Sequence, residues 1–175
     1  MFFYAAYCKE KTNVILYINR KLLFWRVCRL EYLSHSAEET ERIAYDLAAE
    51  IEPPCVICLF GDLGAGKTAF VRGFAQRFGV TEGVCSPTFI IMHCYSGTVQ
   101  LNHYDLYRLG SFEELEDIGF DEQIASGISL IEWPDSFIDY LPEERIDISI
   151  ARSGNDENMR RITVRDLRRA RKEQL

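Results

Sequence analysis

Residues 61–68 have the residue types and the spacing that proteins use to hold a chain of phosphates, G-x-x-x-x-G-K-T. Glycine allows the backbone to turn its N–H groups inward around a β-phosphate, in conformations that a Cβ would obstruct. The Lys67 ammonium can reach the β- and γ-phosphates, and the Thr68 hydroxyl can bind Mg²⁺. The pattern therefore predicts a P-loop that binds ATP and Mg²⁺. Its residues are Gly61, Asp62, Leu63, Gly64, Ala65, Gly66, Lys67 and Thr68.

A second acid is needed to hold Mg²⁺ beside a P-loop, and it normally stands at the end of a buried strand. Glu132 follows Ile-Ser-Leu-Ile at 128–131, which predicts a buried strand, and precedes Trp133-Pro134, which ends it. We therefore expect Glu132 to hold the metal, directly or through water. The alternative is an exposed acid at the end of a strand.

Asp105 stands at the end of another predicted strand, in the segment His-Tyr-Asp-Leu-Tyr-Arg. A carboxylate in that place can orient an attacking water or complete the shell of a metal. Arg108 can neutralise charge that develops on a γ-phosphate, or it can pair with Glu113 or Glu114. We expect His103 to pack and form hydrogen bonds rather than to catalyse.

Residues 86–89, Ser-Pro-Thr-Phe, place two hydroxyls directly before a predicted strand over 89–95; we call them the hydroxyl loop. Pro87 fixes its own φ and favours an extended Ser86. Beside a P-loop, hydroxyls such as that of Thr88 can sense the γ-phosphate and close the loop over Mg²⁺ and ATP. An ordinary turn is the alternative.

The elements that must position these residues follow from apolar patterns. Residues 55–60 are continuously apolar, which is typical of a strand buried on both faces. A helix is predicted after Thr68, and an S-x-x-E capping box at 36–39 predicts an earlier one. Together with a hairpin around 96–97, this predicts an α/β domain with a mixed, partly antiparallel sheet flanked by helices. Further strands are expected at 31–33, 99–104, 128–131, 146–150 and 161–164.

The length of 175 residues and the 47% hydrophobic content indicate one domain with its own core. We predict an N-terminal extension over 1–29, the catalytic domain over 30–165 and a basic tail over 166–175. Our hypothesis for 1–29 is upstream sequence that the native protein lacks; an extra strand pair or an organelle-targeting segment are the alternatives. No uncharged run there approaches the roughly 20 residues of a membrane helix, so we expect a cytoplasmic protein.

Charge and cysteines exclude two further classes of function. The chain has a net charge of −7, and residues 31–158 contain 24 acidic and 7 basic residues. This acidic body should repel nucleic acid, leaving any such contact to the basic ends or to a partner. Cys55 and Cys58 spell CxxC, but residues three apart on a strand face opposite ways. We expect buried apolar thiols rather than a zinc or redox site.

Taken together, residues 61–68, residues 86–89, the H-x-D-L-Y-R segment at 103–108 and the I-E-W-P segment at 131–134 closely resemble the TsaE (YjeE) family. The resemblance covers roughly residues 30–164. It implies a P-loop NTPase fold and an ATPase required for threonylcarbamoyladenosine on tRNA. It also implies that the chain works with TsaB and TsaD, that tRNA is reached only through that complex, and that ATP hydrolysis is weak without them.

The resemblance also assigns roles. It implies that Lys67 contacts phosphate, that Thr68 and Glu132 bind Mg²⁺ and that Asp105 is needed for hydrolysis. The hydroxyl loop would be the first switch segment, and Trp133 would belong to the second. One departure is Ala69, which stands where the family often has another hydroxyl. One possible contact with the α-phosphate is then missing, although backbone N–H groups can still serve.

Four other functions remain to be weighed. A small-molecule kinase would need a lid or acceptor-binding insertion, for which residues 81–126 leave little room. A GTP-driven switch would usually carry N-K-x-D, and a transporter-type ATPase would carry L-S-G-G-Q; neither occurs in the sequence. A module that binds ATP without hydrolysing it stays possible, with Asp105 and Glu132 weakly against it.

Overall fold

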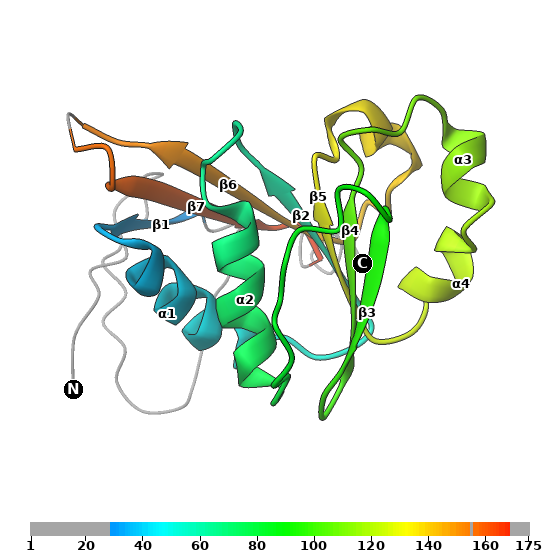
Figure 1. The fold of residues 1–175 in the computed structure, drawn as a ribbon, viewed down its shortest axis with the longest axis horizontal. Helices are drawn as coiled ribbons and strands as arrows, with labels where there is room; N and C mark the ends of the chain where they lie inside the picture. The colour runs from blue at the N-terminus through cyan, green and yellow to red at the C-terminus, as the bar shows by residue number, and fades with distance from the viewer. Residues whose placement is uncertain (1–28, 155, 169–175) are drawn as a thin grey trace, which may run out of the picture.

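The computed structural model describes residues 29–154 and 156–168 (Figure 1). Of the predicted extension only Arg29 is described, and it begins the first strand. The elements are β1 Arg29–Ser34, α1 Ala37–Ala48, β2 Cys55–Phe60, α2 Lys67–Arg77, β3 Met92–Ser96, β4 Gln100–Asp105, α3 Phe112–Glu116, α4 Phe120–Ile124, β5 Ile128–Glu132, the 3-10 helix η1 Asp135–Tyr140, β6 Ile146–Arg152 and β7 Arg160–Asp166.

All seven strands form one sheet in the order β1-β7-β6-β2-β5-β4-β3. The central strands β6, β2, β5 and β4 are parallel, whereas β3, β7 and β1 join the edges in antiparallel pairs. The prediction of a mixed, partly antiparallel sheet is therefore confirmed. The apolar strand β2 and the fully buried strand β5 lie inside the sheet, with both faces covered.

Helices cover the two faces of the sheet unequally (Figure 1). The long helices α1 and α2 pack on one face and share a core with alternate residues of β2. The short elements α3, α4 and η1 pack on the other face. Cys55 belongs to the first core and Cys58 to the second, as their spacing predicts. Burial raises the pKa of Cys58 to about 12, which keeps the thiol protonated.

The start of α1 follows the capping signal with one shift. Ser36 is the N-cap, and its hydroxyl accepts a hydrogen bond of 3.1 Å from the Glu39 N–H. The Glu39 carboxylate accepts from the His35 N–H at 2.7 Å instead of from the Ser36 N–H. Both bonds satisfy backbone donors at the helix start, so α1 begins where the sequence predicts.

The predicted strand over 89–95 was too long, because β3 begins only at Met92. The N–H groups of Ile90 and Ile91 donate to the Pro87 carbonyl at 2.8 and 2.7 Å, which forms a turn. Ile91 also has φ of 68°, in the left-handed region that strands do not use. The hydroxyl loop is consequently part of a longer turn rather than the entrance to a strand.

A close contact between α1 and α2 gives the first prediction. A Cβ built at Gly73 would lie 2.0 Å from the Glu41 carbonyl oxygen, so Gly73→Ala would force the two helices apart. We expect it to lower the free energy of unfolding by about 1–3 kcal/mol, the usual cost of overpacking, although alanine is the better helix former. Urea unfolding measures the change. Gly83→Ala is the control, because a Cβ there meets nothing within 4 Å; equal stability of both variants would contradict the prediction.

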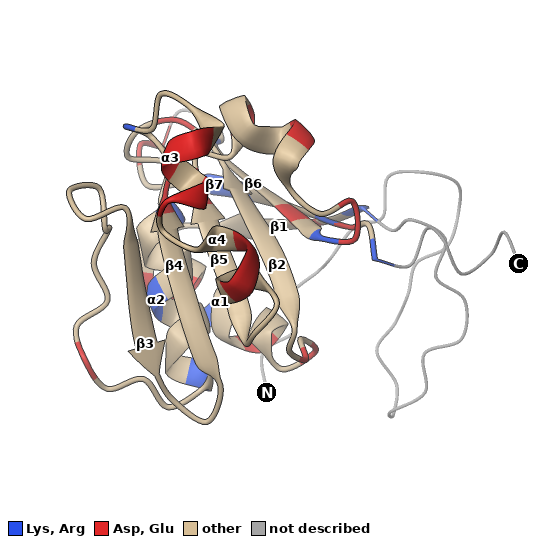
Figure 2. Cartoon of the chain, turned by 90° about the vertical axis from the view of Figure 1, so that its right-hand side faces the viewer, with Lys and Arg blue, Asp and Glu red and all other residues tan. Residues whose placement is uncertain are grey.

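Acidic residues gather on α3 and α4 (Figure 2), and these two helices lie at the opposite end of the molecule from α1 (Figure 1). Among residues 29–154 and 156–168, no helix is both long and apolar enough to cross a membrane.

Candidate functional site

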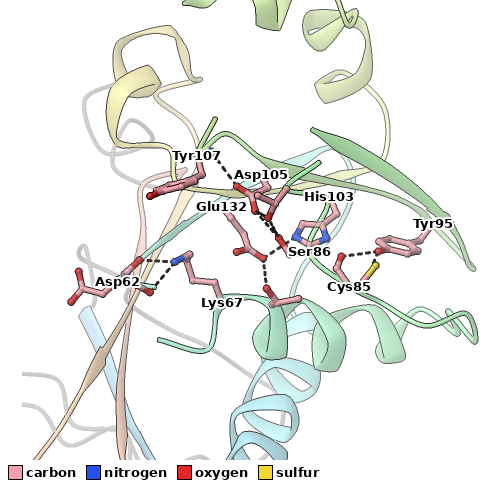
Figure 3. Close-up of polar contacts among 12 residues, drawn as sticks. Asp62, Lys67, Cys85, Ser86, Tyr95, His103, Asp105, Tyr107 and Glu132 are labelled. Carbon is pink, nitrogen blue, oxygen red and sulfur yellow. Dashed lines mark hydrogen bonds and ion pairs between the residues drawn. The ribbon is translucent and has the colours of Figure 1, made fainter. Parts of the chain in front are cut away.

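Three neighbouring strands bring the predicted site residues to one edge of the sheet. In the parallel register, Glu132 at the end of β5 pairs with Leu59 of β2 on one side and with Asp105 of β4 on the other. The P-loop follows β2 directly. The carboxyl ends of parallel strands are where α/β proteins bind ligands, and the side chains of this edge converge there (Figure 3).

The P-loop leads straight into α2. Gly66 is the N-cap of α2 and provides no side-chain hydrogen bond, in contrast to Ser36 on α1. The N–H groups of the first turn of α2 therefore stay available to an anion, and the helix dipole favours negative charge at the same place. Ala69 lies in that first turn and offers only its backbone.

Lys67 is held against the loop that precedes it. Its ammonium donates to the Gly61 carbonyl at 2.6 Å and to the Asp62 carbonyl at 3.1 Å. It also lies 3.6 Å from the centroid of the Trp133 ring, and the residue is only 4% exposed. Burial lowers the Lys67 pKa, and the charge of Glu132 is the largest opposing influence.

Thr68 and Glu132 form a pair of oxygen ligands. The Thr68 hydroxyl donates to Glu132 Oε1 at 2.9 Å. The same carboxylate oxygen lies 3.0 Å from Nε2 of His103, a fully buried residue. Because a carboxylate only accepts, Nε2 carries the proton. Mg²⁺ is usually bound by one or two such oxygens together with waters and substrate phosphates, so this donor set fits the metal that the sequence predicts.

His103 gives the second prediction, because its hydrogen bond fixes the orientation of Glu132. His103→Leu removes the donor and should raise the Mg²⁺ concentration for half-maximal ATP binding by about tenfold or more, as loss of such supporting contacts does elsewhere. His103→Gln can place an N–H near the position of Nε2 and should recover most of the affinity. Titration of ATP binding with Mg²⁺ measures the effect, and ADP binding without metal is the control. An equal loss without metal would mean that His103 supports only the fold.

Asp105 holds the hydroxyl loop. Its Oδ2 accepts from the hydroxyls of both Ser86, at 2.6 Å, and Thr88. Its Oδ1 accepts from the Tyr107 N–H at 3.1 Å. A second tether holds the residue just before the loop, since the Tyr95 hydroxyl donates to the Cys85 carbonyl at 3.3 Å. The loop therefore rests on the carboxylate that the sequence singles out for water activation.

The comparisons with known proteins agree with this geometry. The model of the family described as "Threonylcarbamoyl adenosine biosynthesis protein TsaE" matches residues 34–162. The chain belongs to the TsaE family. The relatives named "tRNA threonylcarbamoyladenosine biosynthesis protein TsaE" include one from Bacillus subtilis, 44% identical over 74% of this chain and 82% of its own length. Another, from Treponema pallidum, is 40% identical over 67% of this chain and 88% of its own length.

The crystal structure of Bacillus subtilis YdiB has the same fold, with a TM-score of 0.69 and 38% identity. The match covers 82% of this chain and 89% of YdiB. This TsaE family member therefore has a P-loop NTPase fold with a mixed sheet, as the sequence predicts.

Arg108 packs on an aromatic ring rather than pairing with an acid. Its guanidinium carbon is 4.5 Å from the centroid of the Phe89 ring. Among the ion pairs of the described residues, none joins it to Glu113 or Glu114. A role on the γ-phosphate stays a prediction.

Aromatic contacts link the separate parts of the site of this TsaE family member. Trp133 has φ of 59° in the left-handed region, which places its ring against Lys67. The Tyr107 ring lies 4.9 Å from the Trp133 ring, centroid to centroid. Tyr107 is the tyrosine of the H-x-D-L-Y-R segment, but the sequence pattern predicted no role for it; its contact with Trp133 exists only in the folded structure.

Proposed function

We propose that this chain is an ATPase of threonylcarbamoyladenosine formation on tRNA, which binds ATP with Mg²⁺ and hydrolyses it together with TsaB and TsaD. The observation that carries the proposal is that Glu132 and Asp105, at the ends of adjacent strands, lie beside Lys67 at the start of α2. Together they supply a phosphate contact, a metal ligand and an acceptor for a water proton. We assign this activity to residues 30–165 and to the cytoplasm.

In this scheme the P-loop backbone, the start of α2 and Lys67 bind the phosphates. The Lys67 ammonium is held by two neutral carbonyls, which are weaker partners than phosphate oxygens. It therefore exchanges these carbonyls for the phosphates when ATP enters. Trp133 covers the same ammonium, so its ring has to move in that exchange. A change in Trp133 environment accompanies binding in this scheme.

In this scheme the oxygens of Thr68 and Glu132 would bind the metal. When bound, Mg²⁺ neutralises charge on the β- and γ-phosphates. The Thr68 hydroxyl, which now donates to Glu132, would offer its oxygen to the metal, and His103 would keep the Glu132 carboxylate in place. Glu132 acts directly or through a water.

Hydrolysis requires that Asp105 release the hydroxyl loop. In the structure one of its oxygens is occupied by the Ser86 and Thr88 hydroxyls. When the loop closes on the γ-phosphate, Thr88 changes partner and Asp105 becomes free to accept a proton from the attacking water. The resting arrangement thus keeps turnover low until the loop moves.

Exposed apolar side chains beside the site support the participation of protein partners. Leu63 of the P-loop is 83% exposed, Phe89 of the hydroxyl loop 84% and Tyr107 61%. Large apolar side chains grouped around a polar site are typical of a surface that another protein covers. TsaB and TsaD are the partners that we propose, with tRNA held by them, because the body of this chain is acidic.

A small-molecule kinase is the second candidate, and the described structure gives it little support. Kinases of this size cover the acceptor with an inserted lid. Here residues 81–126 form the hydroxyl loop, two strands and two five-residue helices packed on the sheet. Within the described part of the chain, this leaves no separate segment to act as a lid.

The test measures ATP hydrolysis by the purified chain alone and with TsaB and TsaD, while threonylcarbamoyladenosine on tRNA is followed. Weak hydrolysis alone, strong hydrolysis with the pair and several rounds of tRNA modification are the expected results. Nucleotide binding without any response to the pair would contradict the proposal and favour the kinase. A screen of small phosphoryl acceptors would then follow.

A further inference from the structure

Arg160, the first residue of β7, reaches the P-loop from a distant part of the chain. Its Nε donates to the Ala65 carbonyl at 2.9 Å, and its Nη2 donates to the Gly64 carbonyl at 3.3 Å. No motif of the sequence points to this contact, since 95 residues separate Arg160 from Ala65.

The same guanidinium also donates to carbonyls of the segment just before β7. Its Nη1 donates to the Met159 carbonyl at 3.1 Å and also to the Glu157 carbonyl. Most of the N–H donors of the planar guanidinium fork are therefore used. A guanidinium that several hydrogen bonds fix in place can in turn fix the position of each carbonyl to which it donates. Arg160 thus joins the segment before β7 to the P-loop.

A second contact between the same elements supports this junction. Gly61, the first P-loop residue, has φ of 142°, and a Cβ built there would lie 2.3 Å from the Ile150 carbonyl oxygen of β6. Ala65 and Ile150 also share one buried core. Strands β6 and β7 form an antiparallel pair, so this pair touches the P-loop both at its start and in its second half.

The consequence for phosphate binding follows from peptide geometry. In a trans peptide the C=O and the next N–H point in opposite directions. Arg160 holds the Ala65 carbonyl, so the N–H of Gly66 is turned away from the arginine. Gly66 is the N-cap of α2, where N–H groups bind an anion. In addition, the guanidinium places a permanent positive charge behind the loop.

We propose that Arg160 is a positioning residue that holds the P-loop in the conformation that accepts phosphates. It acts on the β-phosphate contact common to ADP and ATP, rather than on the hydrolysis step. This inference rests on the proposed nucleotide-binding function. A loop that is already ordered loses less freedom on binding, which raises affinity without a new contact to the ligand.

The test compares Arg160→Met, which keeps the side-chain stem, with Arg160→Lys, which keeps the charge but loses the fork. The control is Arg161→Met, since Arg161 is the next residue of β7 and is exposed. We expect the Kd for ADP and for ATP to rise by about tenfold in Arg160→Met and by less in Arg160→Lys, as loss of hydrogen bonds from a charged donor predicts. The kcat at saturating ATP should change less than twofold.

Two further measurements separate positioning from general stability. Hydrogen exchange of the amides of residues 61–66 should quicken in the nucleotide-free Arg160→Met protein, while its Tm stays close to that of Arg161→Met. Pyrophosphate affinity should fall by the same factor as ADP affinity. Unchanged exchange and unchanged affinities would overturn the proposal, as would a fall in kcat equal to the rise in Kd.

Failure of the proposed function gives a different result. If the wild-type chain binds pyrophosphate but hydrolyses no ATP even with TsaB and TsaD, the proposed function fails and the effect on pyrophosphate still supports Arg160 as a positioning residue. If the wild-type chain binds neither pyrophosphate nor nucleotide, both proposals are overturned.

Discussion

The Lys67→Ala variant is expected to lose ATP turnover and to bind nucleotide at least about a hundredfold more weakly, since hydrogen bonds from a charged donor contribute about 1.5–3 kcal/mol each. In the free protein the ammonium is already at the P-loop, on the Gly61 and Asp62 carbonyls, so it needs only a local shift to reach phosphate. Titration with a fluorescent ATP analogue and a phosphate-release assay measure the two effects.

The control for Lys67→Ala is Lys67→Met, which keeps an unbranched stem against the Trp133 ring but has no charge. Both variants should lose binding to a similar extent if charge is the cause. A Met variant that binds like wild type would indicate that alanine acts through lost packing around Trp133. Unchanged affinity and hydrolysis in both variants would refute the P-loop assignment.

The Asp105→Ala variant is expected to keep ATP binding and to lose turnover by about 10²–10⁴-fold, the range that a positioned general base contributes. Among the hydrogen bonds of residues 29–154 and 156–168, none joins the Asp105 carboxylate to the P-loop, and the partners of this carboxylate are Ser86, Thr88 and Tyr107. Binding should therefore survive its removal. Single-turnover hydrolysis with the variant saturated by ATP measures the loss directly.

Ser86→Ala separates the two roles of Asp105. It removes one donor that holds the hydroxyl loop and leaves the carboxylate intact. Turnover should then stay within about tenfold of wild type, since one hydrogen bond to a charged group is lost while the base remains. If Asp105→Ala instead abolishes binding while turnover per bound ATP persists, Asp105 is structural and another group activates the water.

The P-loop could be recognised from the sequence because its chemistry is local. The groups expected to hold phosphate and Mg²⁺ are backbone N–H groups, one lysine and one threonine within eight consecutive residues, so no long-range contact is needed to define them. The α/β character is also a local property, since it follows from the apolar run of β2 and from the capping signal before α1. For the same reason, motif spacing alone singled out Glu132 and Asp105 as candidates at strand ends.

Only the tertiary structure decided which strand ends meet. Strands β5 and β4 lie on one side of β2 and β6 on the other, and this order depends on how the helices pack on the sheet, not on any one segment. Local patterns likewise failed at Ile91, where a turn closed by the Pro87 carbonyl replaces the predicted strand. Arg160 could not be foreseen at all, because its contact with Ala65 exists only after β7 has joined the sheet. The sequence by itself determined which groups are the candidates for phosphate binding, and long-range packing decided which groups hold them in place.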